Sequence, residues 1–261
     1  MAEFFDQICR ILSETAAKYP GDPSDSETIR EFFSDLAAPV PEAAPASAPA
    51  VAEEKRSVPV QKPETVPAPA PAPVPAATLV QLQELLKDCQ RCELCRRRRN
   101  IVFGEGDPDA RLMFIGEAPG YDEDIQGRPF VGRAGELLNK MITAMQFTRE
   151  EVYIANVIKC RPDDNRTPNP VEIDCCIPFL RRQIELIRPE VIVVLGAVAA
   201  KALLNTESGI SRLRGRWCSY ENIPVMPTFH PAYLLRNESS KKDAWQDLQQ
   251  VMARFGKYHR R

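Results

Sequence analysis

The chain has eight cysteines, and six of them lie in two clusters with the spacing of metal ligands: Cys89, Cys92, Cys95, Cys160, Cys175 and Cys176. A C-x-x-C spacing holds two thiolates near one metal, and the first cluster contains it twice. Two distant segments that each supply two sulfurs would form a four-cysteine site, which both zinc and iron–sulfur clusters accept. Spacing alone leaves the metal open. Cys9 and Cys218 are expected to be small buried hydrophobic residues.

The elements that must position these cysteines are strands and helices in alternation. Apolar runs rich in β-branched and aromatic residues predict four strands: 111–116, 151–160, 189–196 and 223–229. Helical patterns lie between and after them: 134–145, 171–187, 197–204 and 245–255. This alternation predicts a three-layer α/β/α fold around a central, mostly parallel four-stranded sheet. Ligands of such sheets bind beyond the carboxyl ends of the strands, where the chain reads GEAPGYDED, NVIKCRPDDN and FHPAYLLR.

The predicted folded domain covers residues 79–261 and follows two segments of different character. Residues 1–36 contain two short amphipathic helical patterns. We interpret them either as a helical hairpin that packs on the main domain or as a docking arm for a protein partner that the sequence does not identify. Residues 37–78 hold 11 of the 24 prolines, a composition that predicts an extended, disordered linker.

Charge is distributed unevenly along the chain. Residues 1–78 carry 6 Lys+Arg and 12 Asp+Glu, a net charge of −6, and the remaining residues carry 28 and 24, a net charge of +4. A mildly basic domain permits a polyanionic partner. The sequence shows no secretory signal and no apolar run of about 18 residues. We therefore expect a cytoplasmic protein with no membrane partner and no disulfides.

Several motifs in order resemble the iron–sulfur (family 4) branch of the uracil-DNA glycosylases. They are GEAPGYDEDIQGRPFVGRAGELL, YIANVIKCRPDDNRTPNP and FHPAYLLRN, with IVFGEGDPDA and VVLGAVAAKALL fitting the same pattern. The resemblance covers residues 85–255 and leaves out the arm and the linker. It implies an enzyme that hydrolyses the N-glycosidic bond of uracil in DNA, leaves an abasic site and needs no lyase lysine.

The resemblance also implies a [4Fe-4S] cluster with a structural role. Its ligands would be Cys89 and Cys92, then Cys160 of the KCRP motif and Cys176 sixteen residues later. Cys175 is the alternative fourth ligand. The loop PDDNRTPNP would then be tethered at both ends to the cluster.

The base site implied by the resemblance draws on several motifs. His230 would hydrogen-bond the uracil O2 as negative charge builds on the leaving base. Asn156 would read N3–H and O4, because an amide offers the matching acceptor and donor. Phe130 would stack on the base.

Glu117 is the expected group that positions or activates the water, with Asn165 as a helper. Gly116 and Ala118 flank the catalytic candidate Glu117 and are themselves assigned to substrate binding. The better-known branch of the superfamily has an aspartate at the position of Ala118, so this chain departs from that pattern at the water-activating group. Glu123 is expected to exclude the 5-methyl group of thymine, and Tyr121 is its alternative.

Residues after His230 are the expected DNA contacts. Leu234 or Leu235 would wedge into the duplex where the base leaves, and Arg236 would meet a phosphate. The expected partner is uracil-containing DNA, bound by a monomer. Two alternatives remain at this stage: a zinc-stabilised nucleic-acid-binding module without catalysis, and a superfamily relative that excises other deaminated bases or traps DNA covalently.

Overall fold

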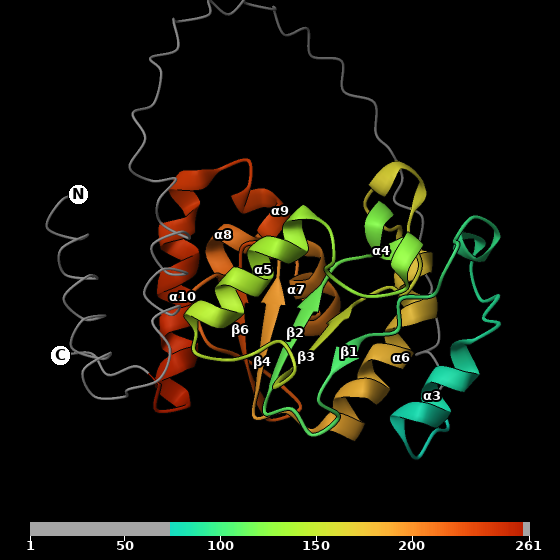
Figure 1. Ribbon diagram of the computed structural model, residues 1–261, viewed down its shortest axis with the longest axis horizontal. Coiled ribbons are helices and arrows are strands. Elements are labelled where there is room, and N and C mark those ends of the chain that lie inside the picture. The colour runs from blue at the N-terminus through green and yellow to red at the C-terminus, as the bar shows by residue number, and fades with distance from the viewer. Residues whose placement is uncertain (1–73, 258–261) are drawn as a thin grey trace, which may run out of the picture.

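A six-stranded sheet forms the centre of the computed structural model, which describes residues 74–257 (Figure 1). The strand order is β1-β3-β2-β4-β6-β5. The four central strands are parallel and are the four that the sequence predicts: β2 (Leu112–Gly116), β3 (Val152–Asn156), β4 (Val191–Leu195) and β6 (Ile223–Thr228). The arm at 1–36 and most of the linker lie outside the described residues.

Two short edge strands were not expected from the sequence. β1 (Glu105–Gly106) pairs with β3, and β5 (Cys218–Tyr220) pairs with β6, both antiparallel. The predicted count of four strands is therefore corrected to six. The strands were missed because they have only two and three residues and lack the apolar run that marks a buried strand.

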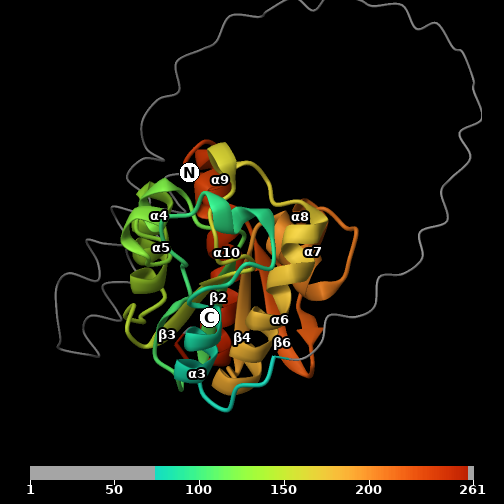
Figure 2. The same cartoon turned by 90° about the vertical axis from the view of Figure 1, so that its right-hand side faces the viewer.

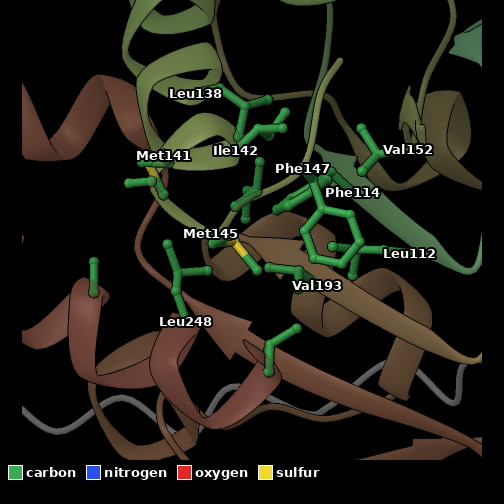
Figure 3. Close-up of a cluster of buried hydrophobic side chains, with 14 of the residues drawn as sticks. Leu112, Phe114, Leu138, Met141, Ile142, Met145, Phe147, Val152, Val193 and Leu248 are labelled. Carbon is green, nitrogen blue, oxygen red and sulfur yellow. The ribbon is translucent and has the colours of Figure 1, made fainter. Parts of the chain in front are cut away.

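Helices cover both faces of the sheet (Figure 2). Helices α5 (Arg133–Ala144) and α10 (Lys241–Arg254) pack on one face, and α6 (Pro170–Ile187) and α7 (Ala197–Leu204) on the other. Successive residues of a strand point to opposite faces. Leu112 and Phe114 accordingly enter the core beside α5, shown in Figure 3 with Met141 and Leu248, whereas residues 113 and 115 enter the core beside α6. The three-layer prediction is confirmed.

Short helices connect these layers: α3 (Leu79–Leu86), α4 (Tyr121–Gln126), α8 (Ile210–Leu213), α9 (Pro231–Leu234), η1 (Glu93–Arg96), η2 (Asp163–Asn165) and η3 (Glu238–Ser240). Most have only one or two turns, so a periodicity argument does not reveal them. Within residues 74–257, no helix is long and apolar enough to cross a membrane.

The chain packs onto the domain from Val74, five residues before the boundary expected at residue 79. Val74 and Ala76 are buried with Phe103 of the main domain. The guanidinium of Arg182 donates to the carbonyl of Ala76 at 2.7 Å. Thr78 then caps α3, because its hydroxyl accepts a hydrogen bond from the N–H of Gln81. The last residues of the expected linker thus lie on the domain surface that α3 and α6 form.

Candidate active site

The carboxyl ends of β2 and β3 bring Gly116 and Asn156 directly opposite each other. A side chain at position 116 would collide with the side-chain oxygen of Asn156 and would come within 2.5 Å of the ring of Phe130. Both side chains therefore lie against the bare Cα of Gly116, which only glycine allows. Asn156 is buried, and its Oδ1 has no hydrogen-bond partner among the described residues. Burying an unpaired amide oxygen is costly, so this atom is a candidate ligand-binding group.

Phe130 has a backbone conformation that residues other than glycine rarely adopt. Its φ is +51°, in the left-handed region, yet the residue is 5% exposed and fixed in place. Gly135 allows this turn, because a Cβ there would overlap the carbonyl of Phe130. Glu123 secures the turn from inside: its Oε1 accepts from the N–H groups of Val131 at 2.8 Å and Gly132 at 3.0 Å.

The other carboxylate oxygen of Glu123 accepts from the N–H of Gly120 at 3.0 Å. The buried carboxylate is thus bonded to three backbone amides, in two loops that flank α4. These three hydrogen bonds give Glu123 a role in holding the Phe130 loop. Its expected role of excluding the thymine methyl group would come in addition. Tyr121, the alternative for that role, is 53% exposed, and the guanidinium of Arg161 lies 5.0 Å above its ring.

Two arginines hold the Phe130 loop from outside. Arg149 donates to the carbonyl of Pro129 at 2.5 Å and to the side chain of Asn139 at 2.7 Å. Arg128 forms a bidentate ion pair with Glu105, at 2.8 and 2.7 Å. Because Glu105 also lies 3.5 Å from Arg149, one carboxylate links both guanidinium groups. Sequence reasoning missed Arg149, since nothing in its local sequence marks a contact with residue 129.

His230 follows β6 and begins α9. Its Nδ1 accepts a hydrogen bond from the N–H of Ala232 at 3.1 Å, so it caps the helix. Its ring lies 5.7 Å from the ring of Phe130, centre to centre. Burial, with a smaller contribution from the charge of Arg236, lowers the pKa of His230 to about 4, against a smaller opposing effect of Glu123. The imidazole is therefore neutral near pH 7, with its proton on Nε2.

Glu117 comes one residue after β2 and is half-buried. In the described part of the chain its carboxylate has no hydrogen-bond or ion-pair partner, and burial alone raises its pKa above the ordinary value. Ala118 is half-buried against the core on the α6 side of the sheet. Asn165 lies on the exposed turn η2, and its Oδ1 accepts from Arg161 at 2.8 Å. That bond occupies the amide oxygen of the expected helper.

The expected DNA contacts lie at the end of helix α9 and directly after it. Leu234 is fully buried in the core, which leaves it no surface for contact with DNA. Leu235 is only partly buried, and Arg236 is exposed beside it. Of the two candidate wedge residues, Leu235 alone is therefore in a position to reach a duplex.

The expected cysteine ligands come together from three segments of the chain. Their thiols act on one another electrostatically: the charges of Cys89 and Cys92 raise the pKa of Cys160, and those of Cys89 and Cys160 raise the pKa of Cys176. Burial is the larger cause and brings these values to about 11 and 12. Cys175 differs from Cys176, because its thiol donates to the carbonyl of Arg91 at 3.2 Å.

Polar donors point at two of these sulfurs. The backbone N–H of Lys159 donates to Cys176 Sγ at 3.3 Å, and the guanidinium of Arg98 donates to Cys160 Sγ at 3.4 Å. Hydrogen bonds to thiolates are a regular feature of iron–sulfur sites. Within residues 74–257, no three His, Cys, Asp or Glu side chains are grouped so as to hold a metal ion.

Lys159 is the second residue that sequence reasoning missed. It lies in the run EVYIANVIKC, which the sequence predicts to be a strand over 151–160, and it is completely buried. The strand ends at Asn156, and residues 157–160 turn away from it. A lysine inside an apolar run is the sequence signal that could have revealed it. Lysine is almost never fully buried unless it is paired, so such a position indicates a specific partner.

Comparison with known proteins identifies the family. The sequence model of the Uracil DNA glycosylase superfamily matches residues 103–249. The chain is 48% identical to a "Type-4 uracil-DNA glycosylase" of Thermotoga maritima over 164 residues, 61% of this chain and 84% of the relative. Proteins of the same name from Sulfurisphaera tokodaii and Saccharolobus solfataricus are each 43% identical, over 67% and 64% of this chain and 83% and 81% of their own lengths. The chain therefore belongs to the uracil-DNA glycosylase superfamily and, within it, to the type-4 uracil-DNA glycosylases.

Proposed function

We propose that this chain removes uracil from DNA by hydrolysing the bond between the base and deoxyribose, using the residues gathered at the ends of β2, β3 and β6. The observation that carries this proposal is the buried, unpaired Oδ1 of Asn156 beside Gly116 and Phe130. A non-catalytic binding module has no need of such an atom.

The amide of Asn156 suits the edge of uracil. Its Oδ1 would accept the N3–H of the base, and its NH₂ would donate to O4. Cytosine presents an acceptor at N3 and a donor at N4, so both contacts would be lost with it. Phe130, fixed by the loop contacts, would stack on the face of an extruded base.

His230 would supply the donor for the leaving group. When the glycosidic bond breaks, its electron pair stays on uracil, which leaves as an anion. The Nε2–H of a neutral imidazole can hydrogen-bond the O2 atom where charge builds, without giving up its proton. The hydrogen bond between Nδ1 and the N–H of Ala232 supports this orientation.

Glu117 would act on the water. As a carboxylate it can accept a proton from a water molecule whose oxygen bonds to C1′ of the sugar. Its half-buried position and its lack of an ion-pair partner among the described residues leave it available as a base. Asn165 stays a candidate helper, although Arg161 occupies its amide oxygen.

Four cysteines fit a [4Fe-4S] cluster better than a single zinc ion. A tetrahedral ion needs four sulfurs about 2.3 Å from one point, whereas a cluster places several metal atoms between its thiolates. We assign Cys89, Cys92, Cys160 and Cys176 as ligands. The charges of Cys89 and Cys160 act on Cys176. Cys175 acts on Cys92 in the same way, but its thiol donates to the carbonyl of Arg91, which favours Cys176 as the fourth ligand. When bound, the cluster would tie together the segments that carry these cysteines.

On the DNA side, we propose that Leu235 and Arg236 contact the duplex and that Glu123 excludes the thymine methyl group while it holds the Phe130 loop. We further propose that the protein works as a cytoplasmic monomer. The partner of the arm at residues 1–36 remains a hypothesis from the sequence.

One experiment tests the central assignment. Protein purified without oxygen is analysed for iron and zinc and is incubated with an end-labelled oligonucleotide that holds one uracil, followed by alkaline cleavage. We expect about four irons per chain and a break at uracil. An oligonucleotide with cytosine at that position is the matched control. Asn156→Ala should lower the rate about 100-fold. A rate for this variant within twofold of the wild type would contradict the assignment of Asn156, and an inactive wild type would contradict the function.

A further inference from the structure

Lys159 is a fully buried charged side chain between the cysteine group and the base site. Its exposure is 0%, and its backbone N–H bonds to the sulfur of Cys176. Its ammonium donates to the backbone carbonyl of Asn156 at 2.9 Å and to Oε1 of Gln183 at 2.6 Å. A single residue thus contacts an expected cluster ligand and the residue that is expected to read uracil.

Both acceptors of the ammonium are neutral, so they do not balance its charge. Gln183 is itself fixed, since its NH₂ donates to the carbonyl of Phe103 at 2.9 Å and to the hydroxyl of Tyr153 at 3.2 Å. The expected ligands lie directly beside this residue: Cys160 follows it in the chain, and Cys176 Sγ accepts the backbone N–H of Lys159 at 3.3 Å. A buried charge without a counter-charge is costly. Cysteines that bind a metal are deprotonated, so the ligated state supplies the negative charge that Lys159 needs.

The ammonium also closes the turn that leads from the base site to the ligands. Asn156 is the last residue of β3, and the next two N–H groups bond to the carbonyls of Gly116 at 2.9 Å and Glu117 at 3.2 Å. The carbonyl of Lys159 then accepts from Val102 at 2.8 Å. The ammonium of Lys159 bonds to the carbonyl of Asn156, so a displacement of either residue would move the other.

We propose that Lys159 is a positioning residue that serves as a counter-ion of the metal cluster and, through its bond to the Asn156 carbonyl, holds the uracil-reading amide in place. The inference rests on the proposed function, because it takes the cluster and the role of Asn156 from there. The cluster would then influence the base site. Its thiolates would stabilise the ammonium of Lys159, and this ammonium would hold Asn156 in place.

A simpler possibility is that Lys159 only closes the turn. The experiment must therefore distinguish turn closure from the counter-ion role. Lys159→Met removes the charge and nearly keeps the shape, whereas Lys159→Arg keeps the charge. Lys201→Met is the matched control, since Lys201 is a partly exposed residue of α7 paired with Glu207. The measurements are iron per chain, the reduction potential of the cluster, and the single-turnover rate of uracil release as a function of DNA concentration.

We expect Lys159→Met to shift the potential to more negative values, because loss of a nearby positive charge favours the oxidised cluster. Its maximal single-turnover rate should fall at least tenfold, while the DNA concentration for half-maximal rate stays within twofold. Lys201→Met should change neither quantity. A turn-closing role alone would lower the melting temperature and leave the potential unchanged, and that result would overturn the proposal, as would a wild-type maximal rate for Lys159→Met.

If Lys159→Met does not assemble the cluster, Lys159→Arg decides the question. A full iron content with the wild-type potential in that variant supports the counter-ion role, and failure to assemble overturns it. The proposed function is judged separately, on the wild-type protein. A wild type without iron or without uracil release would overturn both, whereas an active, iron-containing wild type with an unaffected Lys159→Met overturns this inference alone.

Discussion

The Nδ1 atom of His230 accepts a hydrogen bond from the backbone N–H of Ala232, at 3.1 Å. A nitrogen that accepts a hydrogen bond carries no proton, so the proton of the neutral ring is on Nε2. Burial lowers the pKa to about 4, which keeps the ring neutral through the physiological range. Burial thus keeps the ring that would face the leaving base neutral, and the hydrogen bond at the start of α9 fixes its tautomer.

We predict that His230→Ala folds normally and excises uracil about 100-fold more slowly, the usual effect of removing one donor to a developing anion. The only other histidine in the sequence, His259, offers the control His259→Ala, which should keep the wild-type rate. Nitrogen chemical shifts of labelled histidine should show the Nε2–H tautomer down to about pH 5. A protonated imidazolium signal for His230 at pH 7 would contradict the assignment.

In a plot of excision rate against pH, the fall at acidic pH should reflect the protonation of Glu117. Burial raises its pKa above the ordinary glutamate value. Only the ionised form accepts a proton, so the excision rate should fall as pH decreases through this raised pKa, above about 4.5. Burial lowers the pKa of His230 to about 4, so its protonation should follow that of Glu117 at lower pH. Glu117→Gln should be slow at every pH and should lack this acidic fall. An unchanged acidic fall in that variant would assign it to another group.

Glu123→Gln should loosen the Phe130 loop. The carboxylate accepts three backbone hydrogen bonds while buried, and loss of the charged acceptor should lower the free energy of unfolding by about 1.5–3 kcal/mol. A comparable loss of order in the loop would slow uracil excision about tenfold or more. Glu136→Gln, an exposed change in the first turn of α5, is the control. Urea unfolding and the excision rate measure both effects.

Glu123→Ala tests the second expected role of the same residue. If its side chain also blocks the 5-methyl group, the truncated variant should begin to release thymine from an oligonucleotide while Glu123→Gln should not, since glutamine keeps the bulk. Thymine release by neither variant would restrict Glu123 to holding the loop.

Cys175 and Cys176 offer a matched pair for the fourth ligand. Cys176→Ala should lose most of the bound iron and the visible absorption of the cluster, because it removes a thiolate next to Cys89 and Cys160. Cys175→Ala should keep about four irons per chain, since its thiol bonds to the Arg91 carbonyl. Iron analysis of the two purified proteins separates the assignments, and the reverse result would make Cys175 the ligand.

The pattern of the chain by itself determined the three-layer architecture, because buried strands and amphipathic helices alternate with clear periods. It also marked most candidate site residues, since Glu117 and His230 follow expected strands, Asn156 lies inside one, and all three belong to recognisable motifs. The motifs that resemble the family also predict four cysteine ligands, and this assignment stays a prediction. The very short strands at 105–106 and 218–220 escaped prediction because two or three residues carry no periodicity.

Only the tertiary structure decided which side chains meet. It buried Leu234 and left Leu235 at the surface, placed Arg149 on the carbonyl of Pro129, and turned the ammonium of Lys159 back onto Asn156. These relations depend on where one backbone segment passes another, a consequence of packing among distant residues that no local pattern encodes. The protonation of His230 has the same origin, because it follows from the burial of the ring and from one hydrogen bond at the start of α9.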